Sequence, residues 1–277
     1  MAELMQEQRR MRPGLGTYVE VWARGPAASA ALDAAFASLA QAQACWSFHD
    51  AGSELSRLNA QPGHRVRLSP LTLRLLRAAR ALTRASGGAF DCTVGGILVE
   101  DGILPDHGGR AALPRGGADD IEIGGAWARL RRPVRLTLDG IAKGFAVDVA
   151  LRALRSHGAV AGWINAGGDL RVFGDVALPV QRRELDGRLT PLGALRNAAL
   201  ASSRSASGPH ADRESFPGHL IGQAGQMPAP GVWSVLARSA WRADALTKVA
   251  ANFPAHERAR RVRQLGGCLL ADAGVPL

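Results

Sequence analysis

The chain has 277 residues, 47% of them hydrophobic, which is enough for one large domain or two smaller lobes around a buried core. Its formal net charge is +10, but nearly all of the positive charge is arginine, because Lys143 and Lys248 are its only lysines. The three cysteines are widely spaced and form no CxxC pair, which argues against a disulfide framework and a zinc knuckle. Aromatic residues make up only 5%, so nucleic-acid binding by base stacking is disfavoured, and the arginine-rich C-terminal segment is interpreted as a solvated helix face.

The first half of the chain is predicted to hold one strand and two long helices. The periodicity of apolar residues places them at residues 17–23, 26–46 and 70–86. Ser69 and Pro70 are a suitable N-cap and first residue for the second helix, which ends at the following Gly-Gly pair. Residues 1–14 are expected to be a flexible extension, and residues 95–117, rich in Gly, Pro and Asp, an irregular and mobile segment.

The second half is predicted to be richer in strands. Strands are expected at residues 121–123, 127–130, 134–138, 163–165, 170–173, 176–180, 198–201, 233–237 and 267–270, and helices at 141–158, 243–252 and 255–265. Helices and strands do not alternate in a regular βαβ rhythm, so an α+β fold is favoured over a doubly wound sheet. Residues 15–277 are expected to form a single domain of one or two lobes.

The N-terminal residues are polar and include no apolar run of signal-peptide length. We therefore expect the chain as given to be cytoplasmic, or periplasmic if a leader precedes it. No stretch approaches the roughly 20 apolar residues of a membrane span.

Several common catalytic motifs are missing from the sequence. It contains no GxGxxG, GxxxxGK[ST], HExxH or GxSxG motif. The commonest dinucleotide-binding, P-loop, zincin and hydrolase interpretations are therefore disfavoured.

The most informative segment joins a strand to a helix at residues 138–145, Leu-Asp-Gly-Ile-Ala-Lys-Gly-Phe. Backbone N–H groups at a helix start attract anions, and glycine allows a phosphate to approach closely. Lys143 lies in the first helical turn, where its charge opposes the helix dipole, and this favours a bound anion. The alternative is that Asp139 caps the helix and Lys143 is solvated; the segment alone does not decide between them.

Four other segments carry candidate residues with two interpretations each. The loop 165–169, Asn-Ala-Gly-Gly-Asp, lies between two strands and is either a simple hairpin turn or part of a ligand site. Asp91 and Thr93 follow a helix end, and either contact a ligand or cap the next element. His49 lies in a polar loop and either stacks on a ring or is a surface histidine. Asp244 lies at the start of a predicted helix near the C-terminus, where its negative charge interacts favourably with the helix dipole. It could also bind a cation if further ligands were present.

Together, these segments resemble the FAD:protein FMN transferase (ApbE) family over nearly the whole chain. The matching motifs come in one order: LGTY at the start of the resemblance, SELSRLN, FDxTVG, GIAKGxAVD, NxGGD, a late histidine motif and ADAL. Any one of them could arise by chance, whereas the ordered set is not expected to.

The resemblance implies an ApbE-type, T-fold-like architecture of mixed sheets with packed helices and FAD in a cleft between lobes. It implies an Mg²⁺-dependent transferase that moves FMN from FAD onto a threonine of an acceptor flavoprotein and releases AMP, with FAD hydrolysis as a side activity. A metal suits such chemistry because it offsets charge on the phosphoryl oxygens and aligns the attacking and leaving groups. The alternative is an FAD-binding accessory protein that has lost transfer.

The resemblance also assigns roles to individual positions. The residues expected to contact FAD are Leu15, His49, Ala89, Phe90, Asp91, Thr93, Thr137, Lys143, Asn165, Gly168 and His219. The expected catalytic residues are Lys143, Asp139 and Asp244. The expected metal ligands are the Gly140 carbonyl, Asp244 and Thr247.

The chain departs from the family pattern at three places. Its carboxylate before the AKG turn is Asp139, whereas the family usually has an Asp earlier, as in DLGGIAKG. The segment after His219 lacks the usual Asp and Pro. Lys248 stands where the family's metal-binding threonine is expected, and its charge could replace part of the metal's charge or reach the phosphate.

Overall fold

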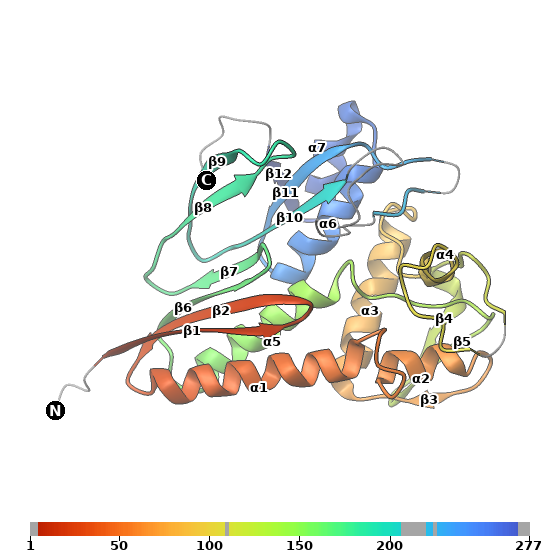
Figure 1. The fold of residues 1–277 in the computed structure, drawn as a ribbon, viewed down its shortest axis with the longest axis horizontal. Helices are drawn as coiled ribbons and strands as arrows, with labels where there is room; N and C mark the ends of the chain where they lie inside the picture. The colour runs from red at the N-terminus through yellow and green to blue at the C-terminus, as the bar shows by residue number, and fades with distance from the viewer. Residues whose placement is uncertain (1–4, 109–110, 206–219, 224–225, 271–277) are drawn as a thin grey trace. The chain divides into compact units, whose positions relative to one another are not determined.

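The computed structural model describes residues 5–108, 111–205, 220–223 and 226–270 (Figure 1). The chain divides into two compact units. The first comprises the described residues within 1–40 and 143–277, and the second those within 41–142. Each unit contains its own sheet.

The first unit is built on a seven-stranded sheet of order β1-β2-β6-β7-β10-β11-β12. Neighbouring strands pair antiparallel throughout this sheet. Its strands are β1 (Gln6–Gly14), β2 (Thr17–Gly25), β6 (Ala161–Ala166), β7 (Asp169–Phe173), β10 (Ala199–Ser205), β11 (Gly231–Ala237) and β12 (Gly267–Leu270). A separate hairpin is formed by β8 (Leu178–Arg183) and β9 (Leu189–Leu195), and the helices of this unit are α5 (Ala142–Ser156), α6 (Ala240–Asn252) and α7 (Ala255–Gln264). The predicted α+β fold class is confirmed.

Strand β1 corrects the expectation of a flexible extension. Leu15 and Gly16 both have positive φ, 54° and 71°, and join β1 to β2 in a two-residue hairpin turn of the kind that matches strand twist. The Arg9 Nε donates to Glu20 Oε1 at 2.6 Å across the pair. The register runs from Gln6 to Gly14, so these residues form an edge strand.

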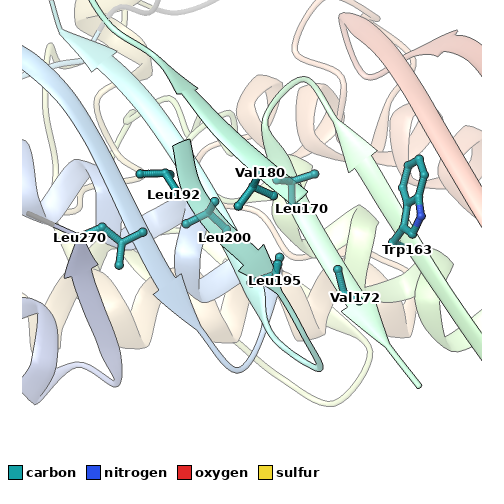
Figure 2. Close-up of a cluster of buried hydrophobic side chains, with 8 residues drawn as sticks. All are labelled: Trp163, Leu170, Val172, Val180, Leu192, Leu195, Leu200 and Leu270. Carbon is teal, nitrogen blue, oxygen red and sulfur yellow. The ribbon is translucent and has the colours of Figure 1, made fainter. Parts of the chain in front are cut away.

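The two faces of β7 pack against different elements, as the alternation of side chains along a strand requires. Leu170 and Val172 belong to an apolar cluster that also includes side chains of the β8–β9 hairpin (Figure 2). The cluster consists of Trp163, Leu170, Val172, Val180, Leu192, Leu195, Leu200 and Leu270. Burial of each such side chain stabilises the fold by about 1.5–3 kcal/mol relative to exposure. Asp169 and Phe173, on the opposite face, meet Lys143 and Arg155 of α5, so this face carries the polar contacts.

The second unit combines short helices with a small sheet of order β3-β5-β4. Its elements are α2 (Glu54–Ala60), β3 (Val66–Arg67), α3 (Pro70–Ala85), α4 (Gly95–Glu100), a 3-10 turn (Ala118–Asp120), β4 (Ile121–Ile123) and β5 (Trp127–Leu130). Helix α1 (Ala28–Trp46) begins in the first unit and ends in the second.

The predicted start of α3 is confirmed at the level of single hydrogen bonds. Ser69 Oγ accepts from the Thr72 N–H at 3.2 Å, and Pro70 is the first helical residue. Glu54 of α2 fixes the cap in turn, because its two carboxylate oxygens accept from the Ser69 N–H and hydroxyl at 2.9 and 2.8 Å. A cap of this kind is worth about 1 kcal/mol.

Other parts of the chain also differ from the sequence expectations. Residues 134–138 form a single bridge at Val134 rather than a strand, because the Asn59 side chain bonds both the N–H and the carbonyl of Leu136, each at 2.8 Å. The segment 95–117 begins with helix α4. Strand β9 was not anticipated, since its sequence LTPLGAL contains Pro and Gly, which are depleted in strands. Within the described part of the chain, no helix is long and apolar enough to cross a bilayer.

Candidate functional site

Two hairpin turns lie at the same end of the main sheet. Gly167 and Gly168 have φ of 60° and 100° and close the β6–β7 hairpin, while the Asn165 Oδ1 accepts from the Gly168 N–H at 3.0 Å. The hairpin interpretation of this loop is therefore confirmed. A Cβ at Gly167 would lie 2.7 Å from the Thr17 hydroxyl, so only glycine lets this turn approach the one that holds Leu15.

Asp169, the last residue of that loop, faces the start of α5. Its side chain is almost fully buried, and its Oδ2 lies 3.7 Å from the Lys143 Nζ. This separation is that of an ion pair rather than of a direct hydrogen bond. Burial, and then the charge of Asp244, raise the pKa of Asp169 to about 7, against the opposing effect of the two lysines. The loop and the helix start thus share one charged cluster.

Helices α5 and α6 cap each other. The Gly144 N–H, in the first turn of α5, donates to Asp244 Oδ2 at 3.1 Å. In return, Asp148 of α5 accepts from the N–H groups of Ala240 and Trp241 at the start of α6, both at 3.0 Å. N–H groups in a first helical turn have no partner within the helix, so each carboxylate satisfies donors of the other helix. Burial raises the pKa of Asp148.

Gly144 makes this arrangement possible. A Cβ there would lie 2.4 Å from the Ala240 carbonyl oxygen, which is backbone and cannot move aside cheaply. The glycine of the AKG segment therefore serves the packing of α5 on α6.

Lys248 closes the cluster on the α6 side. Its ammonium contacts Asp244 Oδ1, the Asp244 carbonyl at 3.2 Å and the Ser203 hydroxyl at 3.1 Å. Thr247 donates to the same Asp244 carbonyl and shares a second hydrogen bond with Ser203, each at 2.6 Å. The lysine is thus held by α6 and by strand β10.

A second group of predicted residues gathers in the second unit. Asp91 Oδ1 accepts from the Thr93 N–H and hydroxyl at 2.8 and 2.6 Å, and its Oδ2 lies 3.5 Å from an Arg115 guanidinium nitrogen. The Thr93 hydroxyl accepts from the Gly116 N–H at 3.1 Å. Asp91 therefore closes a turn around Thr93, which accounts for both residues structurally.

Thr137 lies beside this turn, because its N–H donates to the Cys92 carbonyl at 2.9 Å. Its hydroxyl donates to Asp139 Oδ2 at 3.1 Å, and Asp139 itself is exposed. The N–H of Ala142 donates to the Leu138 carbonyl at 2.7 Å, so residues 139–141 form the turn that leads into α5.

Comparison with known proteins identifies the family. The model of the ApbE family matches residues 15–269. The chain belongs to the ApbE family.

Individual relatives agree with this assignment. A Rhodobacter capsulatus protein named FAD:protein FMN transferase is 34% identical over 179 residues, which are 58% of this chain and 34% of that protein. The chain thus spans about a third of the length of this curated relative. Among solved structures, the ApbE protein from Thermotoga maritima has a TM-score of 0.81 at 21% identity and covers 95% of this chain and 93% of that one. The apo flavinyl transferase ApbE from Pseudomonas stutzeri has a TM-score of 0.78 at 20% identity, covering 96% and 94%. At these identities the structures show the fold, and they confirm the expected ApbE-type architecture.

The ApbE motifs fall into two groups within this fold. The first unit holds Leu15, Lys143, Asn165, Gly168, Asp244 and Thr247, and the second holds His49, Ala89, Phe90, Asp91, Thr93, Thr137, Asp139 and Gly140. His49 is exposed in the loop between α1 and α2, whereas Ala89, Phe90 and Thr93 are buried. His219 lies outside the described residues.

Three contributors to the site were not among the predicted site residues. The sequence indicates Asp169 only as the end of a turn and Asp148 only as a letter of the GIAKGxAVD motif, and it gives no indication of Ser203. The available signal for Asp169 was a carboxylate directly after the Gly-Gly turn and close to a segment that carries a lysine. No local pattern indicates Ser203, because its partners lie 44 and 45 residues away.

The Mg²⁺ that the ApbE resemblance implies does not fit the residues around Asp244. One carboxylate oxygen of Asp244 contacts the Lys248 ammonium and the other accepts from Gly144. The Thr247 hydroxyl is engaged with the Asp244 carbonyl and with Ser203. Over the residues that the structure describes, no group of three His, Cys, Asp or Glu side chains could hold a metal ion.

Proposed function

We propose that this protein is an FAD:protein FMN transferase. The observation that carries the proposal is the cluster at the end of the main sheet, where Lys143 stands in the first turn of α5 beside the buried Asp169. Membership of the ApbE family and the Rhodobacter capsulatus relative support this reaction. The substrates would be FAD and a flavoprotein that presents a threonine.

The reaction exchanges one phosphorus–oxygen bond for another. The threonine hydroxyl oxygen attacks the FMN phosphorus, the bond from that phosphorus to the AMP oxygen breaks, and AMP leaves with the electron pair and, in net balance, the hydroxyl proton. Negative charge spreads over the phosphoryl oxygens during transfer, so catalysis depends on positioning and charge stabilisation.

The residues of the first unit supply both requirements. Lys143 offers a positive charge next to the N-terminus of α5, where the helix dipole also attracts anions. The Gly167-Gly168 turn offers backbone without side chains for a close approach. Asp169 positions the lysine side chain from the sheet. Because the donor set at Asp244 does not fit Mg²⁺, these residues are proposed to act without a metal ion.

For the second unit by itself, we propose that the ordered turn around Thr93 contacts a flavin. Family membership is the support for this assignment, together with the ordered turn in which Asp91 holds Thr93. Phe90 is buried, so we propose that it supports the shape of the turn and that the neighbouring backbone faces the ligand.

A second candidate is an FAD-binding accessory protein without transfer activity. It is favoured by one observation, the presence of Lys248 at the position where the family's threonine is expected. The two candidates share FAD binding and differ in covalent chemistry.

The test is to incubate the purified protein with FAD and an acceptor flavoprotein fragment that carries the target threonine. Transfer predicts an acceptor heavier by one FMN less one water in intact-mass spectra and an equal amount of AMP by chromatography. A matched acceptor with valine in place of the threonine should stay unmodified. Tight FAD binding without AMP or modified acceptor would favour the accessory protein, and no FAD binding would refute both.

A further inference from the structure

The three N–H donors of the Lys248 ammonium are all engaged by oxygens of the protein. A lysine ammonium has three N–H donors, and three oxygens surround this one: Asp244 Oδ1, the Asp244 carbonyl and the Ser203 hydroxyl. The side chain is 18% exposed and that of Asp244 is 2% exposed. The ammonium therefore stands as a fixed internal cation rather than as a mobile surface charge.

The ammonium occupies oxygens of a kind that a divalent cation also binds. Mg²⁺ requires near-octahedral coordination by oxygen, usually from one or two carboxylates, substrate phosphates and water. Asp244 of α6 supplies the carboxylate. However, the Lys248 ammonium already contacts its Oδ1, and its Oδ2 accepts a hydrogen bond from the Gly144 N–H. A metal ion at Oδ1 would have to displace the Lys248 ammonium from that oxygen. It would then be repelled by the same ammonium nearby.

The net charge around Asp244 also disfavours the binding of a divalent cation. The cluster consists of Asp169, Asp244, Lys143 and Lys248, whose formal charges sum to zero when all four are ionised. A site with no net negative charge gains little from binding Mg²⁺, because the attraction of the carboxylates is offset by the repulsion of the lysines.

We propose that the Lys248 ammonium takes the place of a divalent metal ion beside Asp244, so that this protein binds the phosphates of a flavin dinucleotide without a divalent cation. The part that concerns FAD rests on the proposed function, whereas the part that concerns the metal does not. Lys248 acts through Asp244 and Ser203, and is a positioning residue rather than a catalytic one.

The first experiment measures Mn²⁺ binding to the protein without flavin, by electron paramagnetic resonance of the unbound ion. The wild-type protein should show no saturable site. Lys248→Thr removes the ammonium and places a hydroxyl at the family's threonine position, so it should gain a saturable Mn²⁺ site. The double variant Lys248→Thr with Asp244→Asn should lose that site again. Lys248→Met, which removes the charge without adding a ligand, should bind Mn²⁺ more weakly than Lys248→Thr.

The second experiment measures FAD affinity by fluorescence, in EDTA and in Mg²⁺. For the wild-type protein the two dissociation constants should agree, whereas Lys248→Thr should bind FAD roughly tenfold or more weakly in EDTA than in Mg²⁺. Saturable Mn²⁺ binding by the wild-type protein that Asp244→Asn abolishes, or a wild-type FAD affinity that collapses in EDTA, would overturn the inference.

The outcomes separate this inference from the proposed function. If the wild-type protein binds no FAD under either condition, the proposed function fails, and the Mn²⁺ titration still decides the fate of the metal site. If Lys248→Thr does not fold by circular dichroism, the wild-type measurements alone support or overturn the inference.

Discussion

The first unit contains two lysine–aspartate pairs, and their lysine side chains differ in exposure. Lys248 lies on α6 and contacts three oxygens, while Lys143 lies at the start of α5 with its ammonium 3.7 Å from Asp169 and a third of its side chain exposed. An ammonium whose donors are all taken by the protein can offer charge but little direct bonding. The Lys143 side chain is 33% exposed against 18% for Lys248, so Lys143–Asp169, the looser pair, is the more accessible one and is proposed to meet a ligand.

The largest predicted effect follows from removing the lysine of the looser pair, Lys143–Asp169. Lys143→Ala should lower the rate of FMN transfer roughly 100-fold to 1000-fold, because it removes the charge that we propose stabilises the reacting phosphate. Lys143→Arg keeps the charge and should retain more activity. Single-turnover AMP release measures both variants, with circular dichroism as the check on folding. Equal rates for Lys143→Ala and the wild-type protein would remove Lys143 from the mechanism.

The next effect concerns the approach of α5 to α6. Gly144→Ala should lower the free energy of unfolding by about 1–3 kcal/mol, because the new methyl group would meet the Ala240 carbonyl. Gly125→Ala is the matched control, since a Cβ there meets no atom within 4 Å, and it should change stability by less than about 0.5 kcal/mol. Urea denaturation compares the two. If both variants are equally stable, the close approach of the helices is not required.

The buried carboxyl of the looser pair should give a pH-dependent stability. The pKa of Asp169 is raised from 3.8 to about 7 in the folded state, so the folded state binds this proton more tightly than the unfolded state. Its contribution to stability is therefore fully present below about pH 4 and is lost as pH rises toward 7. The slope from one such group is at most about 1.4 kcal/mol per pH unit.

Asp169→Asn tests that slope. The variant lacks the titrating group, so its stability relative to the wild-type protein should rise between pH 4 and pH 7 in urea denaturation. Asp175→Asn, at an exposed position, serves as the control and should follow the wild-type curve. Parallel curves for Asp169→Asn and the wild-type protein would show that Asp169 titrates normally.

The smallest predicted effect concerns the mutual caps. Asp148→Ala removes the acceptor of two N–H groups at the start of α6 and should cost about 1 kcal/mol of stability. Asp175→Ala is the control for loss of an exposed carboxylate. Thermal unfolding followed by circular dichroism would measure the difference, and an unchanged Tm for Asp148→Ala would argue that water replaces the cap.

Local features of the site could be predicted from the sequence. The AKG segment placed Lys143 correctly in a first helical turn, and the Gly-Gly pair correctly indicated the β6–β7 hairpin. Both depend on residues next to each other in the chain, where helix-start and turn rules apply.

The contacts between distant segments could not be predicted. Gly144 and Asp244 are 100 residues apart, and Asp148 meets α6 across 92 and 93 residues. The contact partners of Lys248 depend on how α6 packs against β10. No single-sequence pattern encodes such packing, so the sequence shows the departure at Lys248 but leaves open whether its charge replaces that of a metal or reaches the phosphate.

The most direct test of the central claim is an experimental structure of the protein with FAD bound. We predict that a pyrophosphate oxygen of FAD lies within hydrogen-bonding distance of the Lys143 Nζ, at the start of α5, while Lys248 keeps its contacts with Asp244 and Ser203. A pyrophosphate bound away from Lys143, or a metal ion on Asp244 with Lys248 displaced, would contradict it.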